Sequence, residues 1–355
     1  TGFSSRQQEF DPPTGYQFFS INKSMLVIIY PTGTKRSIHL NHFVVEAEKA
    51  DPDTIFITTQ EFLEKPIDEW PLDTKFVVRV GAYSVQEILN ALTKAWALGY
   101  CIFPNVPAIK NCLRKAQFYD LCLENNINIP KFQVFADDGP DWHNIDFTEY
   151  GDCVIKPSIG TLGNGIYFVK PEDVPNMIDH IIETKDEFYE NCEIIVQQRI
   201  QNKQKISQSI RVFCFLGEPT VAITITNGED LYNKAGSDLK INQEIIYGDN
   251  GEILDTLGYD LDFGTVSNVN KGGVAGPYYP SEELKEECRK ICKATGNEFT
   301  CIDFLQNENG EFYCLESNVA PHLYRAFIIY GGKVNHPEMI FKYLLDNKTK
   351  GSIML

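Results

Sequence analysis

The chain has 355 residues, of which 43% are hydrophobic, and its formal net charge at pH 7 is −17. This length predicts two or three packed domains, and the acidic balance argues against a nucleic-acid partner, whose phosphate backbone demands a cationic face. The longest apolar runs, such as MLVIIY at 25–30, are too short to span a bilayer, so we expect no membrane partner.

The first domain is expected to be an α/β unit over residues 21–105, preceded by a polar, turn-rich arm at 1–20. Its strands are predicted at MLVIIY, TIFITT and KFVVRVG. SIHLNHFVVEAEKA has helical spacing, and SVQEILNALTKAWALG (84–99) predicts a helix with a Ser84 cap and a terminal glycine.

A second domain is expected over 106–190 and a third over 191–355. In the second, the apolar stripe of residues 110–126 predicts one helix, NINIPKFQVF turns into a strand, and residues 171–190 predict another helix. In the third, residues 281–296 predict a helix. The insert at 227–266 is rich in Gly, Asp and Asn and has little periodicity, so we expect it to select the substrate.

The ten cysteines include no C-x-x-C pair, and most lie in apolar, strand-like segments. Reduced core cysteines of a cytoplasmic protein are therefore expected rather than disulfides or a zinc site.

The segment VIKPSIGTLGNGIYFV (154–169) joins two predicted strands through a glycine-rich loop. Glycines let backbone N–H groups approach an anion because no Cβ blocks the approach. The loop is not a Walker A motif, since G-K-[ST] is absent. We predict a lid over phosphates with Lys156 behind it; a merely flexible hairpin is the alternative.

The segment CIDFLQNENGEFYCLESNVAP (301–321) reads as two strands around Asn309-Gly310, a pair typical of a two-residue type I′ turn. Counting back from that turn pairs Asp303 with Glu316, and Asn318 then lies on the same sheet face. Like charges directly opposite destabilise a sheet unless something positive lies between them, and Mg²⁺ prefers hard oxygen ligands. The pattern predicts a Mg²⁺ site, with a solvated acidic sheet face as the alternative.

The order of these motifs resembles the ATP-grasp superfamily, most closely its ribosomal-protein-S6 glutamate ligase (RimK-like) branch of carboxylate–amine ligases. The resemblance covers roughly residues 75–325 and implies an α/β (α+β) ATP-grasp fold, in which central and C-terminal domains sandwich ATP beside an N-terminal α/β domain. The matching motifs, in family order, are VVRVGAYS, CLRKAQFYDLCLENNINIP, IKPSIGTLGNGI, VQQRI, SIRVF, SNVNKGG and CIDF with LESNVAP.

Site residues follow from the same resemblance. It implies that Asp303, Glu316 and Asn318 bind Mg²⁺ or Mn²⁺, and that Arg211, Asn268 and Lys271 stabilise the transferred group, Lys271 standing in for an arginine. The residues implied to bind ATP are Lys115, Lys156, Gly160, Thr161, Gly163, Gly165, and the hinge residues Gln197, Gln198 and Ile200, where Gln198 replaces the usual acid. Arg79, and more weakly Arg325, are candidates for holding a substrate carboxylate, because a guanidinium grips it bidentately.

The implied activity is that of an ATP-dependent carbon–nitrogen ligase, which forms an amide or peptide bond through an acyl phosphate and releases ADP and phosphate. Its expected partners are small-molecule or peptide substrates, and a homo-oligomer is left open. One alternative is a small-molecule (polyol) kinase with the same nucleotide site, although this acidic chain offers few basic residues for a polyphosphate substrate. The other is a non-catalytic nucleotide-binding module, against which the metal residues and both lysines argue.

Overall fold

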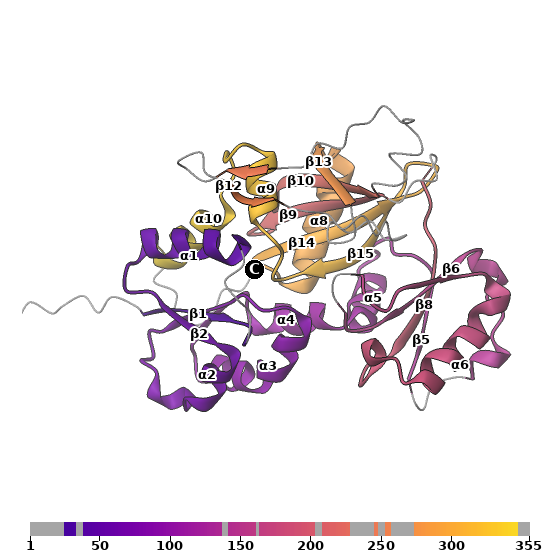
Figure 1. The fold of residues 1–355 in the computed structure, drawn as a ribbon, viewed down its shortest axis with the longest axis horizontal. Helices are drawn as coiled ribbons and strands as arrows, with labels where there is room; N and C mark the ends of the chain where they lie inside the picture. Colours follow the sequence, from indigo (N-terminus) through magenta and orange to yellow (C-terminus); the bar gives the residue numbers. More distant parts are fainter. Residues whose placement is uncertain are drawn as a thin grey trace, which may run out of the picture.

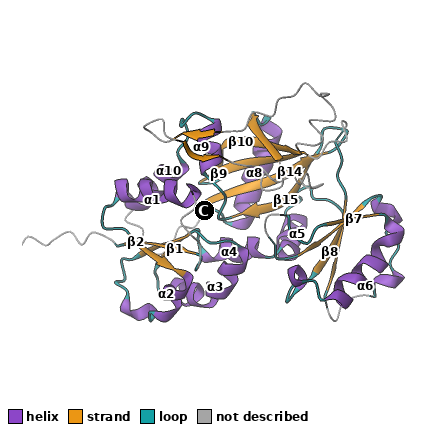
Figure 2. Ribbon diagram, in the orientation of Figure 1, coloured by secondary structure: helices purple, strands orange, loops and turns teal. Residues whose placement is uncertain are grey.

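The computed structural model describes residues 25–32, 38–136, 141–160, 163–202, 208–227, 245–247, 253–256 and 273–346. Three larger sheets, with helices packed around them, form its framework (Figure 1). The N-terminal sheet is parallel, and the other two are antiparallel. Helices and strands are mixed in all three parts (Figure 2), so the predicted α/β class is confirmed.

The N-terminal sheet has the strand order β2-β1-β3-β4. Helix α1 lies on one side of this sheet, and α2 and α3 lie on the other (Figure 1). The elements are β1 (Leu26–Tyr30), α1 (Ile38–Ala50), β2 (Ile55–Thr58), α2 (Thr59–Glu64), a 3₁₀ turn (Ile67–Glu69), β3 (Lys75–Val78), α3 (Ala82–Ala97) and β4 (Cys101–Phe103).

Helix α3 starts earlier than the sequence pattern predicts. Its N-cap is Gly81, whose backbone is extended, and the first helical residue is Ala82. The predicted Ser84 cap is therefore wrong, because the chain has already turned into the helix when it reaches Ser84. The predicted end is confirmed: Gly99, with φ of +92°, follows the last turn.

The single helix predicted over 110–126 is two helices, α4 (Val106–Leu113) and α5 (Lys115–Glu124). Arg114, between them, has an extended backbone. The backbone N–H of Lys115 donates to the carbonyl oxygen of Ser158 at 2.9 Å rather than to the preceding helical turn. This bond to the middle sheet is the physical reason for the break.

The middle sheet has the order β5-β8-β6-β7, and α6 covers it. The helix predicted over 171–190 is shorter, because Lys185 adopts the left-handed conformation and ends α6. The elements are β5 (Phe132–Phe135), 3₁₀ turns (Trp142–Asn144 and Thr148–Tyr150), β6 (Cys153–Pro157), β7 (Tyr167–Val169), a 3₁₀ turn (Pro171–Asp173), α6 (Val174–Thr184), a 3₁₀ turn (Glu187–Tyr189) and β8 (Ile194–Gln198).

The C-terminal sheet has the order β13-β10-β9-β14-β15. The predicted helix over 281–296 is confirmed as α8, capped by Ser281 and ended by Gly296. The elements are β9 (Gln208–Phe215), β10 (Glu218–Asn227), β13 (Gly273–Tyr278), α8 (Glu282–Thr295), β14 (Phe299–Gln306), β15 (Phe312–Asn318), α9 (Tyr324–Ile329) and α10 (His336–Asp346). A separate pair, β11 (Ile245–Tyr247) and β12 (Ile253–Thr256), belongs to the predicted insert, whose other residues between 228 and 266 lie outside the described ranges.

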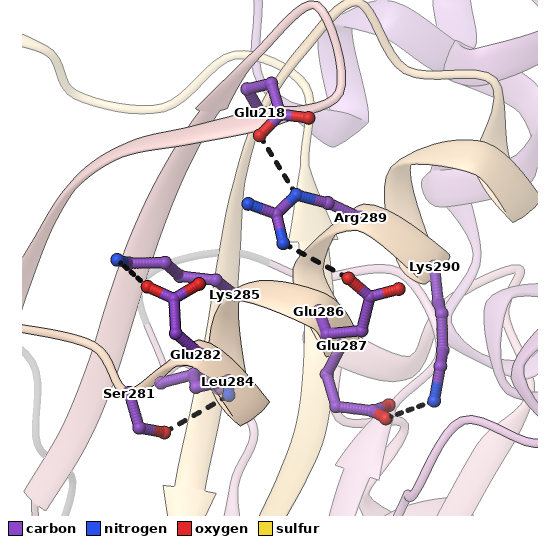
Figure 3. A network of polar contacts seen from close by, with 9 residues as sticks. All are labelled: Glu218, Ser281, Glu282, Leu284, Lys285, Glu286, Glu287, Arg289 and Lys290. Atoms are coloured by element: carbon purple, nitrogen blue, oxygen red, sulfur yellow. Dashed lines mark hydrogen bonds and ion pairs between the residues drawn. The ribbon is translucent and has the colours of Figure 1, made fainter.

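Helix α8 separates its apolar and charged residues cleanly. Leu284, Cys288 and Ile291 are buried against the C-terminal sheet. The solvent side carries ion pairs with a spacing of three residues, and Arg289 also reaches Glu218 at the start of β10 (Figure 3). Exposed pairs of this kind add about 0.5 kcal/mol each at most, so the buried side holds the helix in place.

The N- and C-terminal parts share one hydrophobic core. Leu26 and Phe43 from the first part pack in the same cluster as Phe213, Phe299 and Phe341 from the last. The rings of Phe43 in α1 and Phe341 in α10 lie 4.8 Å apart between centroids. The last described helix therefore covers the first sheet.

All ten cysteines are free, and seven of them are buried, which agrees with the expected core thiols. Among the helices of the described ranges, none is both long and apolar enough to cross a membrane.

Candidate active site

Three charged side chains form a row across adjacent strands of the C-terminal sheet. Arg211 on β9 is the cross-strand neighbour of Asp303 on β14, which is in turn the neighbour of Glu316 on β15. Arg211 Nη2 lies 3.1 Å from Asp303 Oδ2. The predicted pairing of the two carboxylates is confirmed, and a cation stands at one end of the row.

The pairing arises by a different route from the predicted one. Gln306 pairs with Phe312, so the turn has five residues, and of the Asn309-Gly310 pair only Gly310 has a positive φ. The predicted type I′ turn is therefore wrong. A bulge between Asp303 and Phe304 in the β14–β15 register shifts the pairing by one residue and restores the facing carboxylates.

Lys115 stands at the other end of the row. Its Nζ lies 3.3 Å from Glu316 Oε2 and donates to the carbonyl oxygen of Gly160 at 3.2 Å. Residues 115, 160 and 316 are far apart in the sequence and belong to α5, the glycine-rich loop and β15. The structure therefore brings the predicted lysine, lid and acidic hairpin together at one place.

Lys156, on β6, is buried with 6% of its surface exposed. Its Nζ donates to the hydroxyl oxygen of Tyr119 at 2.7 Å. The Tyr119 hydroxyl in turn donates to Gln197 Oε1 at 3.0 Å. Tyr119 was not among the predicted site residues. The available signal was its position four residues after Lys115, which puts both on one face of a helix.

Burial and neighbouring charges shift the ionisation of this site. Burial, helped by the charge of Lys115 and opposed by Glu316, lowers the pKa of Lys156 to about 7. Burial raises the pKa of Asp303 above its usual range, although Arg211 opposes this. Burial would also raise the pKa of Glu316, but Lys115, Arg211 and Lys156 together lower it. Strong opposing shifts in one cluster are typical of a functional site.

The donor set fits a hard divalent cation. Within the described ranges no three His, Cys, Asp or Glu side chains gather as metal ligands, so a metal here would use two carboxylates and the amide oxygen of Asn318. Mg²⁺ commonly takes one or two carboxylates and completes its shell with water and substrate phosphates. Asn318 is exposed, and its Oδ1 accepts a hydrogen bond from the backbone of Ala320. The three candidate ligands thus lie on the neighbouring strands β14 and β15, with Asp303 buried and Asn318 exposed.

The loop between β6 and β7 is held from both sides. The Tyr83 hydroxyl on α3 donates to the carbonyl oxygen of Ile159 at 3.3 Å, and the Tyr189 hydroxyl donates to that of Gly165 at 2.6 Å. Gly165 has φ of +64°, and a Cβ there would lie 2.8 Å from the Cβ of Phe188. Glycine is therefore required at this position, as a tight turn demands.

The remaining predicted residues are distributed as follows. Gln198 ends β8, and its backbone N–H donates to the carbonyl oxygen of Lys131 at 2.8 Å; Ile200 follows, half-buried. Gly160 and Gly163 lie in the described part of the loop. Thr161, Asn268 and Lys271 lie outside the described residues.

Arg79 lies directly after β3, at the boundary between the N- and C-terminal parts. Its Nη2 donates to the carbonyl oxygen of Pro321 at 2.7 Å, and its guanidinium lies 4.9 Å from the ring centroid of Phe43. Burial lowers the pKa of Arg79 to about 10. Arg325 is half-buried in the first turn of α9, four residues after Pro321. The loop that follows Asn318 therefore runs past Arg79 to Arg325.

No protein-family model and no curated protein matches the sequence. Solved structures do match. The ATP-grasp ligase PsnB, complexed with a phosphomimetic variant of its minimal precursor, Mg and ADP, aligns with a TM-score of 0.60 over 92% of this chain and 99% of that chain, at 13% identity. This chain has the ATP-grasp fold.

Two other solved structures align over a similar share of the chain. The D-cycloserine synthetase DcsG aligns with a TM-score of 0.62 over 90% of this chain and 99% of its own, at 12% identity. D-alanine–D-alanine ligase from Bacillus anthracis aligns with a TM-score of 0.55 over 91% and 96%, at 14% identity. The ATP-grasp resemblance inferred from the motifs is thus confirmed at the level of the fold, and at these identities the substrate does not follow.

Proposed function

We propose that this ATP-grasp chain is an ATP-dependent carboxylate–amine ligase. The observation that carries the proposal is the convergence at Lys115, whose ammonium touches both the carbonyl oxygen of Gly160 in the glycine-rich loop and the carboxylate of Glu316. A lid loop, two lysines and a pair of facing carboxylates are the parts that a site for Mg·ATP requires.

The chemistry follows from the charges. A carboxylate is a poor electrophile, and transfer of the γ-phosphoryl group of ATP to it creates an acyl phosphate that an amine can attack with loss of phosphate. Lys156 and Lys115 would offset the charge of the phosphates, and Arg211 would stabilise charge on the transferred group. Mg²⁺ held by Asp303, Glu316 and Asn318 would neutralise the β- and γ-phosphates when bound.

Arg79 is proposed to hold a carboxylate of the acid or of the amine substrate. It is half-buried, and its Nη2 donates to a neutral group, the carbonyl oxygen of Pro321. Its pKa is lowered by burial, so an incoming anion would stabilise the guanidinium. PsnB has been solved with a precursor peptide, and we therefore include short peptides among the candidate substrates of this chain.

Trapping with hydroxylamine tests the activity. The protein is incubated with ATP, Mg²⁺ and pools of amino acids and peptides, with hydroxylamine in place of the amine. A ligase yields a hydroxamate together with ADP and phosphate. A stable phosphate ester without hydroxamate would instead identify a kinase and would refute the ligase proposal.

A matched pair of variants on the acidic hairpin gives the control. Glu316→Gln removes a proposed metal ligand, whereas Glu311→Gln changes the same side chain in the exposed turn of the hairpin. We expect Glu316→Gln to abolish Mg²⁺-dependent hydroxamate formation and Glu311→Gln to retain it. Equal activity of the two variants would contradict the metal assignment.

A further inference from the structure

Tyr119 joins two parts of the site that lie on different strands of the middle sheet. Its hydroxyl oxygen is 2.7 Å from Lys156 Nζ on β6 and 3.0 Å from Gln197 Oε1 on β8. All three side chains are buried, with exposed fractions of 0% for Tyr119, 6% for Lys156 and 3% for Gln197. Water therefore cannot readily replace any member of this chain of hydrogen bonds.

The direction of the chain follows from the chemistry of the three groups. A charged lysine only donates, so the hydroxyl oxygen of Tyr119 must accept from Lys156. The tyrosine proton is then left to donate, and the Gln197 atom that faces it must be the acceptor Oε1. The charged form of Lys156 thus fixes the orientation of the Gln197 amide.

Packing holds the tyrosine ring in a single place. The ring of Phe132 on β5 lies 4.9 Å from that of Tyr119 between centroids, and the ring of Phe118 lies 6.1 Å away. Phe132 is also the cross-strand neighbour of Gln197. Tyr119 itself follows Lys115 by one turn of α5, so the same helix places a cation at Glu316 and a hydroxyl at Lys156.

We infer that Tyr119 is a positioning residue for nucleotide binding: its hydroxyl holds the Lys156 ammonium where the phosphates bind and orients Gln197 at the adenine hinge. This inference rests on the proposed function, because it requires a nucleotide in the site. We do not place Tyr119 in contact with the nucleotide. It acts through Lys156 and Gln197, the two side chains proposed to bind the nucleotide.

Binding of Mg·AMP-PNP to the full chain tests the inference without any knowledge of the substrate. Tyr119→Phe removes one oxygen atom, and Tyr100→Phe is the matched control, since that buried hydroxyl bonds the carbonyl oxygens of Ile67 and Trp70 in the N-terminal part. We expect Tyr119→Phe to weaken binding by about 10- to 100-fold, and Tyr100→Phe by less than about threefold. If the wild-type protein binds no nucleotide, the proposed function fails; if it binds and both variants bind equally well, only the role of Tyr119 fails.

Two further measurements separate positioning from a general loss of structure. In a Lys156→Met background, Tyr119→Phe should cost less than about threefold, because the ammonium that Tyr119 positions is gone and only the bond to Gln197 remains to be lost. A ¹⁵Nζ–¹H NMR signal, assigned to Lys156 by its loss in Lys156→Met, should persist in Tyr100→Phe and vanish in Tyr119→Phe. Additive effects in the double variant, or an unchanged signal, would overturn the inference. Should Tyr119→Phe not fold, Gln197→Met must weaken binding instead, and an unchanged affinity would overturn it equally.

Discussion

Nucleotide binding to this site should take up a proton. Burial lowers the pKa of Lys156 to about 7, helped by Lys115 and opposed by Glu316, so above pH 7 the free protein holds this lysine mostly neutral. Phosphates favour the charged form and raise its pKa on binding. The affinity for nucleotide is therefore highest below the pKa that Lys156 has in the free protein. Above that pKa the affinity falls by up to tenfold per pH unit, until the pH reaches the pKa that Lys156 has in the complex.

Between pH 7.0 and pH 8.5 this linkage predicts a loss of about 15-fold in the affinity for Mg·AMP-PNP, or about 1.6 kcal/mol. Isothermal titration calorimetry at pH 8.5, in two buffers with different enthalpies of ionisation, should report an uptake close to one proton per nucleotide. The phosphates of the nucleotide are already ionised at this pH and do not contribute. Lys156→Arg keeps the charge at every pH and should remove both effects. Proton uptake near zero in the wild-type protein, with equal affinities at the two pH values, would refute the reasoning.

Three further outcomes are expected. Burial lowers the pKa of His336 to about 4, so the folded protein disfavours its charged form. The unfolding free energy should therefore be unaffected above about pH 6.5 and should fall by about 3 kcal/mol as the pH is lowered to 4. Urea titrations should show this loss in the wild-type protein and not in His336→Gln. Asp303→Asn should raise the unfolding free energy at pH 7 by about 1 to 3 kcal/mol, because burial, opposed by Arg211 but helped by Glu316, holds the pKa of Asp303 above its usual range, so the fold disfavours its charge; a loss would mean that the ion pair with Arg211 dominates. Gly165→Ala should lower the melting temperature more than Gly296→Ala, since both glycines have a positive φ but only Gly165 faces a close neighbour, and equal shifts would contradict the contact with Phe188.

The acidic hairpin shows what the sequence could predict of this site. Counting back from the Asn309-Gly310 turn placed Asp303 opposite Glu316, and alternation along the strand then placed Asn318 on the same face. The turn has five residues rather than two, which displaces the register by one residue, and the unforeseen bulge displaces it back, so the two errors cancelled. A bulge has no strong sequence signal, so this part of the hairpin could not be predicted.

Tertiary contacts explain the remaining differences. The residues around Arg114 have a helical pattern, and the break arises from a hydrogen bond between Lys115 and Ser158, which directly follows β6 and which local propensity cannot foresee. The same limit concealed Tyr119, whose partners lie 37 and 78 residues further along the chain. Motif order was sufficient for the fold because the glycine loop, the lysines and the paired acids are each short-range patterns.

The core shared by Phe43 and Phe341 has a consequence during synthesis of the chain. The N-terminal sheet leaves the ribosome before α10 (His336–Asp346) does. The hydrophobic core on the α1 side of this sheet nevertheless needs α10 to cover it. Until those residues are available, Leu26 and Phe43 expose apolar surface that a chaperone or a neighbouring nascent chain could bind. The strands that form first in sequence order are thus among the last to be fully covered.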